Sequence, residues 1–327
     1  MPLLIAIIVI ALLFDYTNGF HDTANAIATS VSTRALSPRV AVLMAATLNM
    51  LGAFMGKKVA ETVGKGIVEA GSVTLTLVLA ALIGAVAWNL ITWHFGIPSS
   101  SSHALIGGLV GAAIAEGGLN IVLWGGVFDK VIIPMIASPL IGFCVAFALM
   151  TGLLWFVRKW SPTPVNRTFR LLQPISAGFM ALSHGRNDAQ KTMGVITLAL
   201  VASGKLTDFS IPLWVVVSCA VAMALGTYSG GWRIIHTLGS KVIKLDPIHG
   251  FAAETSAATV IQVASFIGVP VSTTHTITTA IMGVGATKRL SAVRWGVAGS
   301  IVIAWVLTLP AAALIAGGAY VLLDLFV

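Results

Sequence analysis

Two hydroxyl-rich phrases of the chain could bind an anion. Residues 96–103 read GIPSSSSH, and residues 268–275 read GVPVSTTH. Both lie in strongly apolar sequence, where clustered hydroxyl groups are unfavourable unless a polar partner uses them. Proline is well tolerated in the first turn of a helix, and Ser or Thr caps the free amides there. Each phrase therefore predicts a helix start whose hydroxyl and N–H groups form an oxyanion site.

The candidate anion ligands are the hydroxyl residues that precede the histidine of each phrase. Ordinary helix capping would explain one Ser per phrase but not the whole cluster. His103 and His275 either donate to the anion or only brace the loop. The predicted anion-binding hydroxyls are those of Ser100, Ser101, Ser102, Ser272, Thr273 and Thr274.

A second pair of phrases supplies two carboxylates. Residues 19–26 read GFHDTANA and residues 185–192 read GRNDAQKT. The matched pairs are Asp22 with Asp188 and Asn25 with Lys191. Carboxylates inside membrane segments are rare and usually face a partner, an ion path or a substrate. We expect Asp22 and Asp188 to bind or relay a coupling cation, and Asn25 and Lys191 to help balance charge at the substrate. Structural hydrogen bonds between packed helices are the alternative.

The first carboxylate lies on a polar stripe. Asp15, Asn18, Asp22 and Asn25 are spaced so that they share one face of a helix. Asp15 has no acidic counterpart in the second half, and a structural hydrogen bond explains it equally well. Further coupling-ion candidates are Asn18 and Glu254, and supporting candidates that could tune proton affinity are His21 and Arg186. An interhelical bond is an equal alternative for Glu254, and the identity of any metal stays open.

Composition places the chain in a membrane. Hydrophobic residues make up 57% of the 327 residues and charged residues only 9%, whereas a soluble chain carries roughly 25% charged residues. The net charge of +8 then indicates membrane topology and not nucleic-acid binding. Cys144 and Cys219 are far apart in apolar segments and predict neither a disulfide nor a metal pair. No cofactor is predicted.

The matched phrases recur at nearly equal distances along the chain, which predicts two related halves. We expect an all-α membrane protein with a first repeat at 1–157, a short basic cytoplasmic linker at 158–171 and a second repeat at 172–327. The expected membrane segments, about ten, lie near 2–32, 39–56, 73–94, 98–117, 131–157, 173–202, 211–232, 249–267, 270–287 and 292–322. Segments 98–117 and 270–287 are short and Gly-rich, so they could be broken or re-entrant.

The distribution of Lys and Arg predicts the orientation. Five crossings per half place most of these residues in inside loops if the N-terminus lies outside, as the positive-inside rule requires. Both termini are then outside. An odd number of crossings inverts one half relative to the other, and inverted repeats place a substrate site near the midplane.

The phrases together resemble the inorganic phosphate transporter family. The residues that carry the resemblance are NGFHDTANAIAT at 18–29, SHGRNDAQKTMG at 183–194 and the two G-x-P-x-S-[ST]-[ST]-H phrases. The resemblance implies a secondary symporter in the cell membrane that moves inorganic phosphate with H⁺ or Na⁺. His21-Asp22 is similar to the bacterial proton-coupled carriers of metal phosphate, because sodium-coupled members usually have Asn-Asp there. Arg186 stands where the family often has a small residue, which leaves the ion stoichiometry open.

We expect transport by alternating access. The expected partners are the lipid bilayer around the protein and the transported ions, and the sequence leaves a homo-oligomer open. The nearest alternative is a sulfate permease of the same family, since hydroxyl groups suit any tetrahedral oxyanion. An anion channel is less favoured, because paired carboxylates and two matched anion sites favour a carrier. An enzyme is not expected, since neither a metal-ligand cluster nor triad spacing supports a phosphatase.

Overall fold

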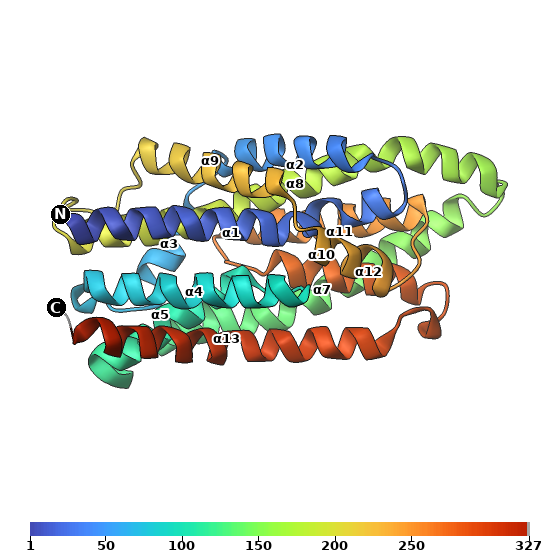
Figure 1. The fold of residues 1–327 in the computed structure, drawn as a ribbon. Coiled ribbons are helices and arrows are strands. Elements are labelled where there is room, and N and C mark those ends of the chain that lie inside the picture. Colours follow the sequence, from blue (N-terminus) through green and yellow to red (C-terminus); the bar gives the residue numbers. More distant parts are fainter. Residues whose placement is uncertain (326–327) are drawn as a thin grey trace.

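The computed structural model describes residues 1–325, and its regular structure over that range is helical, apart from one isolated β-bridge between Val68 and Val122. The helices run side by side in an elongated bundle. The N-terminus and the C-terminal end of the last helix lie at the same end of this bundle (Figure 1). The α-helices are α1 (Pro2–Ser32), α2 (Pro38–Ala53), α3 (Lys58–Lys65), α4 (Leu75–Phe95), α5 (Ser101–Gly117), α6 (Trp124–Val127), α7 (Ile133–Phe156), α8 (Pro162–Ala202), α9 (Leu213–Ser229), α10 (Trp232–His236), α11 (Pro247–Ile267), α12 (Thr273–Ala286) and α13 (Trp295–Asp324). Shorter turns are the 3₁₀ segments η1 (Ala70–Ser72), η2 (Gly118–Ile121) and η5 (Leu290–Ala292) and the π segments η3 (Phe128–Ile132) and η4 (Thr237–Lys241).

Within residues 1–325, six helices are long and apolar enough to cross a membrane, and two bent helix pairs bring the number to as many as 8. The bent pairs are α2 with α3, at 72°, and α9 with α10 and η4, at 60°. The expected number of about ten is therefore met only in part. α12 has 14 residues, fewer than the roughly 20 that a full crossing needs. α8 is long but carries Arg186, Asp188 and Lys191 in its middle.

Two helical hairpins contain the hydroxyl-rich phrases. Gly96 caps the C-terminus of α4 and Gly268 that of α11, and both glycines take the left-handed conformation, with φ of 65° and 81°. Glycine is favoured there because it has no Cβ to clash. After each glycine four residues without helical structure lead to the start of a shorter helix, α5 at Ser101 and α12 at Thr273. The predicted helix starts are thus present in both phrases.

Each hairpin turn is held by a threonine from a bent helix pair. The Thr237 hydroxyl on η4 donates to the Gly96 carbonyl at 3.0 Å, and the Thr62 hydroxyl on α3 donates to the Gly268 carbonyl at 2.7 Å. We call these two hydrogen bonds the hairpin latches. Each latch joins the two halves of the chain, because the threonine and the glycine come from different halves.

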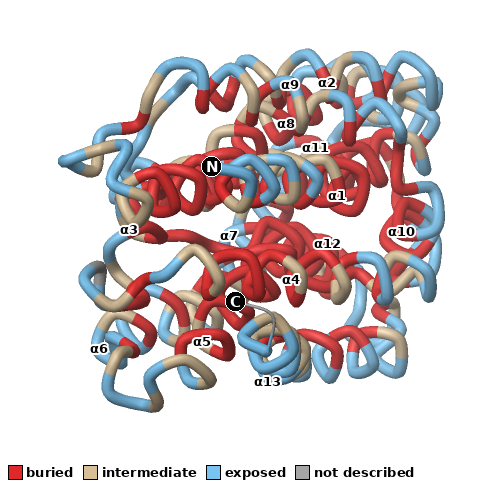
Figure 2. The backbone as a smooth tube through the Cα atoms, turned by 60° about the vertical axis from the view of Figure 1, so that its left-hand side comes forward, coloured by how far each residue is buried: buried red, intermediate tan, exposed pale blue. Residues whose placement is uncertain are grey.

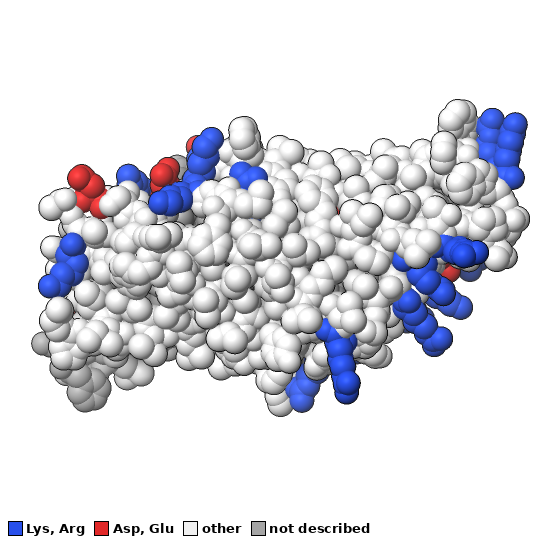
Figure 3. All heavy atoms as spheres, turned by 90° about the horizontal axis from the view of Figure 1, so that it is seen from above, with Lys and Arg blue, Asp and Glu red and all other residues white. Residues whose placement is uncertain are grey.

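Buried residues lie on the inner helices of the bundle, and exposed residues lie on the outer ones. Figure 2 shows buried residues along α1 and α12 in the middle of the bundle and exposed ones along outer helices such as α13 and α2. The outer faces are apolar, as Leu140 and Leu314 illustrate. On the face in Figure 3 most of the surface is uncharged, which suits contact with lipid.

The segment between the halves differs from the expected loop. α8 begins at Pro162 after Ser161, so residues 162–171 are helical. Pro at the first helical positions is pre-organised for a helix start, and the sequence Ser161-Pro162 supplies that signal. Residues 158–161 alone remain outside helices.

Candidate functional site

The middle of the bundle brings two carboxylates together. α1 supplies Asp22 and α8 supplies Asp188, and both are buried. Asp22, His184 and Asp188 each offer one atom that could bind a metal ion, and these three atoms lie within 4.8 Å of one another. Two carboxylate oxygens and an imidazole nitrogen at this separation are a ligand set that a metal cation can use. The site can therefore attract a cation.

Asp22 lies between the starts of both short helices. The Ser101 hydroxyl donates to Asp22 Oδ2 at 3.2 Å, and the Thr274 hydroxyl donates to Asp22 Oδ1 at 3.3 Å. His21 Nδ1 is also hydrogen-bonded to Asp22 Oδ1, at 2.6 Å. One carboxylate of the first half thus contacts hydroxyls from both phrases.

Asp188 has a fixed cation beside it. Lys191 is buried and forms an ion pair with Asp188 Oδ1. The His184 imidazole lies 3.1 Å from Asp188 Oδ2, and the Thr273 hydroxyl donates to the same oxygen at 3.1 Å. A buried charge is unfavourable unless it is paired, and Lys191 provides that pairing for Asp188.

The lysine and the asparagine link the halves. Lys191 Nζ also donates to the Ser102 hydroxyl of the first phrase and to the Val271 carbonyl, at 3.1 Å, of the second. Asn25 Nδ2 donates to the hydroxyls of Thr273 at 3.2 Å and Thr274 at 2.9 Å, while its Oδ1 has no partner within the described chain. Each half therefore contacts the hydroxyl phrase of the other.

The hydroxyl residues divide into two groups. Ser100 and Ser272 are helix caps, since their hydroxyls accept the backbone N–H groups of His103 and His275 at 3.2 Å. The hydroxyls that contact charged groups at the centre are those of Ser101, Ser102, Thr273 and Thr274. The capping interpretation thus describes Ser100 and Ser272, and the four other predicted hydroxyls can serve an oxyanion.

Hydrogen bonds from neighbouring polar residues hold His21 and His184, the histidines beside the two carboxylates. His21 Nε2 is hydrogen-bonded to the Thr92 hydroxyl at 3.1 Å, and the Ser99 hydroxyl donates to Thr92 at 2.9 Å. In the second half, His184 Nδ1 is hydrogen-bonded to Asn49 Oδ1 at 3.0 Å. Neither Thr92 nor Asn49 was among the predicted site residues, because each comes from a helix distant in sequence.

His103 and His275 face each other. Their rings lie 4.8 Å apart between centroids, and His275 stacks on Trp305 at 4.0 Å. Neither ring nitrogen of His275 has a hydrogen-bond partner in the described part of the chain. This arrangement favours the bracing interpretation over direct donation to an anion.

Glu254 does not join the central cluster. Its carboxylate accepts hydrogen bonds from Thr29, Ser176 and Gln173. Thr29 lies two turns beyond Asp22 on α1, or about 10 Å along the helix. Glu254 is near the start of α11 whereas the hydroxyl phrase follows its end, so Glu254 lies apart from Asp22, and its role as a coupling-ion ligand stays a prediction.

Of two further predicted residues, Arg186 points away from the carboxylates and Asn18 lies on the same helix as Asp22. Arg186 Nη1 donates to Gln262 Oε1 at 2.7 Å and makes no ion pair with Asp188. Successive helical residues point about 100° apart, which turns Arg186 away from the face that carries Asp188. Asn18 is buried one turn before Asp22, and its Oδ1 has no partner among residues 1–325.

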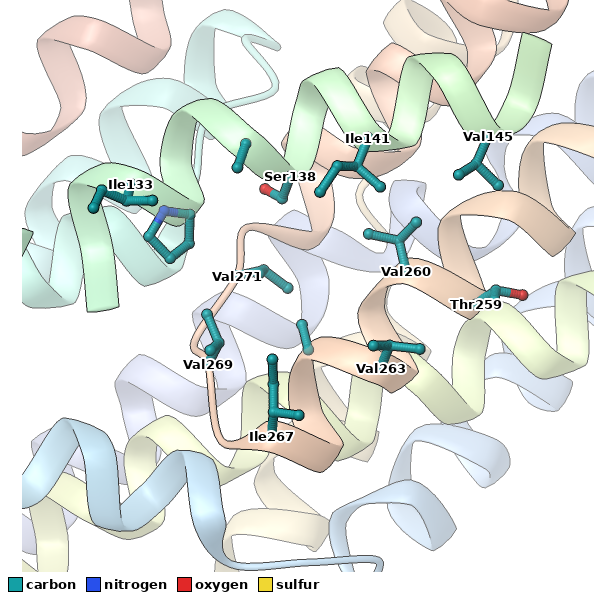
Figure 4. Close-up of a pocket in the computed structure, with 13 residues that line it drawn as sticks. Ile133, Ser138, Ile141, Val145, Thr259, Val260, Val263, Ile267, Val269 and Val271 are labelled. Carbon is teal, nitrogen blue, oxygen red and sulfur yellow. The ribbon is translucent and has the colours of Figure 1, made fainter. Parts of the chain in front are cut away.

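An apolar groove of about 410 Å³ lies between α7 and α11 (Figure 4). Its lining is almost entirely aliphatic, with Ile141 and Val145 facing Val260 and Val263. Ile141 and Val263 are exposed on the outer surface. A groove without charged lining suits hydrocarbon and not an oxyanion, so the polar cluster is the better site.

A buried polar site between two hairpins, in the middle of an apolar helical bundle, is typical of a membrane carrier. A family model described as the phosphate transporter family matches residues 18–316. The chain belongs to the phosphate transporter family.

Several relatives cover almost the whole chain. A probable low-affinity inorganic phosphate transporter of Rhizobium meliloti is 54% identical over 326 residues, covering 99% of this chain and 97% of that protein. One of the same description from Bacillus subtilis is 48% identical over 329 residues, covering 99% and 98%. A solved structure named the sodium-dependent phosphate transporter has 27% identity, a TM-score of 0.91 and 100% coverage of both chains.

These likenesses confirm the predicted family and the prediction of a transporter instead of an enzyme. They also confirm a phosphate transport protein with transmembrane helices, of the multi-pass membrane class.

Proposed function

We propose that the chain is a secondary symporter that moves inorganic phosphate together with H⁺ or Na⁺ by alternating access. The observation that carries the proposal is the interlocked centre, where Asp22 accepts hydrogen bonds from Ser101 and Thr274 of different hairpins. If the hairpins moved relative to each other, these hydrogen bonds would break and new ones would form. A bound ligand favours one such state through its differential affinity.

The charges at the centre explain why phosphate would need a cation. Two carboxylates, Asp22 and Asp188, stand against the single ammonium of Lys191. With both imidazoles neutral, one net negative charge remains, and it repels an incoming phosphate anion. A cation that binds at Asp22 removes this charge, so the anion and the cation bind better together than apart.

The donors for phosphate come from both hairpins. The Ser101, Ser102, Thr273 and Thr274 hydroxyls lie at the N-termini of α5 and α12, where free N–H groups favour an anion. Asn25 and Lys191 add an amide and an ammonium. Phosphate that keeps one proton can also donate to a carboxylate, which sulfate at neutral pH does not do.

The cation position is supported by the Asp22, His184 and Asp188 ligand set within 4.8 Å. The same three groups suit either the coupling ion or a metal that travels with phosphate. The solved relative named a sodium-dependent phosphate transporter supports Na⁺, and the adjacent His21 supports H⁺. Transport assays with each cation separate these cases.

The two halves, 1–157 and 172–327, are proposed to be inverted repeats of about ten membrane segments in total. The matched hairpins support this, since each has a left-handed glycine, a capping Ser and a Thr latch from the other half. We place both termini outside the cell membrane, because Arg34 and Arg39 lie at the opposite end of α1 from the N-terminus.

Uptake of labelled phosphate into proteoliposomes tests the proposal. We expect uptake to follow an imposed H⁺ or Na⁺ gradient and to collapse in Asp22→Asn, since the variant cannot carry the negative charge that attracts the cation. Asp129→Asn, an exposed residue outside the centre, is the matched control.

Wild-type uptake in Asp22→Asn contradicts the role of that carboxylate. Stronger competition by sulfate than by unlabelled phosphate favours a sulfate permease. Flux that ignores every cation gradient favours a channel.

A further inference from the structure

Asp15 is a buried carboxyl group that the proposed cycle does not yet use. It lies on α1, two turns before Asp22, and is fully buried. The Thr192 hydroxyl on α8 donates to Asp15 Oδ1 at 2.9 Å. Asp15 Oδ2 has no hydrogen-bond partner within the described chain, and no Lys, Arg or His of residues 1–325 forms an ion pair with it.

This environment does not suit a permanent carboxylate. A buried ion without a counter-charge is strongly unfavourable, and such groups neutralise instead. A purely structural hydrogen bond to Thr192 would need only an amide or a hydroxyl. The carboxyl group therefore adds something that a neutral side chain would not, which is the ability to take up and release a proton.

The hydrogen-bond inventory also favours a proton here. Asn18 lies one turn from Asp15 on the same face of α1, and its Oδ1 is a second buried acceptor without a donor. Buried acceptors are normally satisfied. A proton on Asp15 Oδ2 would change one of these acceptors into a donor.

The charged groups around Asp15 connect it to the phosphate site. α8 presents Thr192, with Lys191 beside it in sequence and Asp188 one turn earlier. α9 presents Cys219, which is buried. On α1 itself Asp22 and His21 follow two turns on. On α4 the titratable residue is His94, which lies near the C-terminal end of that helix, beyond the contact between His21 and Thr92. α2 has Arg39 at its start. α5 has His103 at its start.

We propose that Asp15 is a binding site for the coupling proton, separate from the Asp22 and Asp188 pair. The inference rests on the proposed symport. A proton from one side binds Asp15 Oδ2 and forms the neutral acid, and on the other side the O–H bond breaks and the proton passes to water. The ionised form would add a second net negative charge near the phosphate site, so protonation favours phosphate binding.

The decisive experiment compares two modes of transport in proteoliposomes that contain Asp15→Asn. Asn resembles the protonated acid, so we expect exchange of internal for external phosphate within about threefold of wild type, a loss of under 1 kcal/mol. We expect accumulation driven by a pH gradient to disappear and the pH dependence of KM to flatten. Asp15→Glu, which keeps the titratable group, should restore the gradient response.

A second variant avoids reliance on the folding of Asp15→Asn. Thr192→Ala removes the only hydroxyl of residues 1–325 that donates to Asp15. Because that bond favours the ionised form, the pH profile of KM should move to higher pH. An unchanged profile, or full response of Asp15→Asn to the pH gradient, overturns the inference. Wild-type uptake driven by a Na⁺ gradient alone also overturns it while leaving phosphate symport intact. Absence of any phosphate exchange in the wild type would contradict the proposed function itself.

Discussion

Asp22 and Asp188 occupy matched places in the two halves, yet their partners differ. Asp188 has a buried lysine, Lys191, within its own helix. Asp22 has only the His21 imidazole and hydroxyl groups, and the position that matches Lys191 is Asn25. Asp188 thus has a counter-charge on its own helix, whereas in the proposed symport Asp22 would take its counter-charge from the transported cation. The difference between Asn25 and Lys191 would then account for the different behaviour of the two carboxylates.

The largest effect that this comparison predicts is on Lys191. In Lys191→Met, Asp188 loses its counter-charge in a buried site, which typically costs about 3–5 kcal/mol of stability. We also expect phosphate transport to be lost. Thermal unfolding in detergent measures the first effect and labelled uptake the second.

The double variant Lys191→Met with Asp188→Asn is the control for charge. Removing both charges should recover most of the lost stability, because an uncompensated ion no longer remains, but not transport. Equal stability of the single variant and the wild type would show that the pair is not needed to neutralise Asp188.

A lysine in the first half should abolish the difference between the halves. In Asn25→Lys the ammonium would lie near Asp22, and a pair at about 4 Å contributes roughly 4 kcal/mol at an effective dielectric constant of about 20. Binding of the coupling cation should weaken by more than about 100-fold. The concentration of H⁺ or Na⁺ needed for half-maximal uptake measures this change, with Asn25→Gln as the uncharged control. An unaltered cation requirement would contradict the assignment of Asp22 as the exchangeable site.

The smallest predicted effect distinguishes caps from ligands. Ser100→Ala and Ser272→Ala each remove a helix cap, with an expected loss of about 1 kcal/mol of stability and little change in the KM for phosphate. Ser101→Ala should do the reverse, since its hydroxyl contacts Asp22 at the centre. Thermal unfolding and uptake kinetics on the three variants provide the comparison. A raised KM in the Ser100 variant alone would reverse these roles.

The sequence predicted which polar groups meet better than it predicted their surroundings. The repeated phrases correctly indicated two helix starts, at Ser101 and Thr273, because Ser caps act locally. The prolines were expected in the first turn, but Pro98 and Pro270 precede the caps and lie outside the helices. Asp188 and Lys191 are three residues apart, a spacing at which side chains on a helix can meet, and the structure pairs them. Local patterns of this kind depend only on neighbours along the chain.

What the sequence could not predict depends on contacts between distant segments. Glu254 was expected to bind either a coupling ion or a neighbouring helix, and only the packing of α11 on α8 shows that its partners include Gln173 and Ser176. Arg186 is two residues from Asp188, yet the turn of the helix directs it to Gln262. Thr92 could not be chosen as the partner of His21, because tertiary packing alone brings α4 beside α1.

The hairpin latches have a consequence for the direction of transport. Each latch is one hydrogen bond between a threonine hydroxyl and a glycine carbonyl, at 2.7 Å on one hairpin and 3.0 Å on the other. A neutral bond of this kind contributes about 0.5–1.5 kcal/mol, so in the proposed cycle the latches would hold the two hairpins about equally. Two hydrogen bonds of similar strength would favour neither direction of transport. A cell whose ion gradient reverses would lose phosphate through the same path by which it was gained.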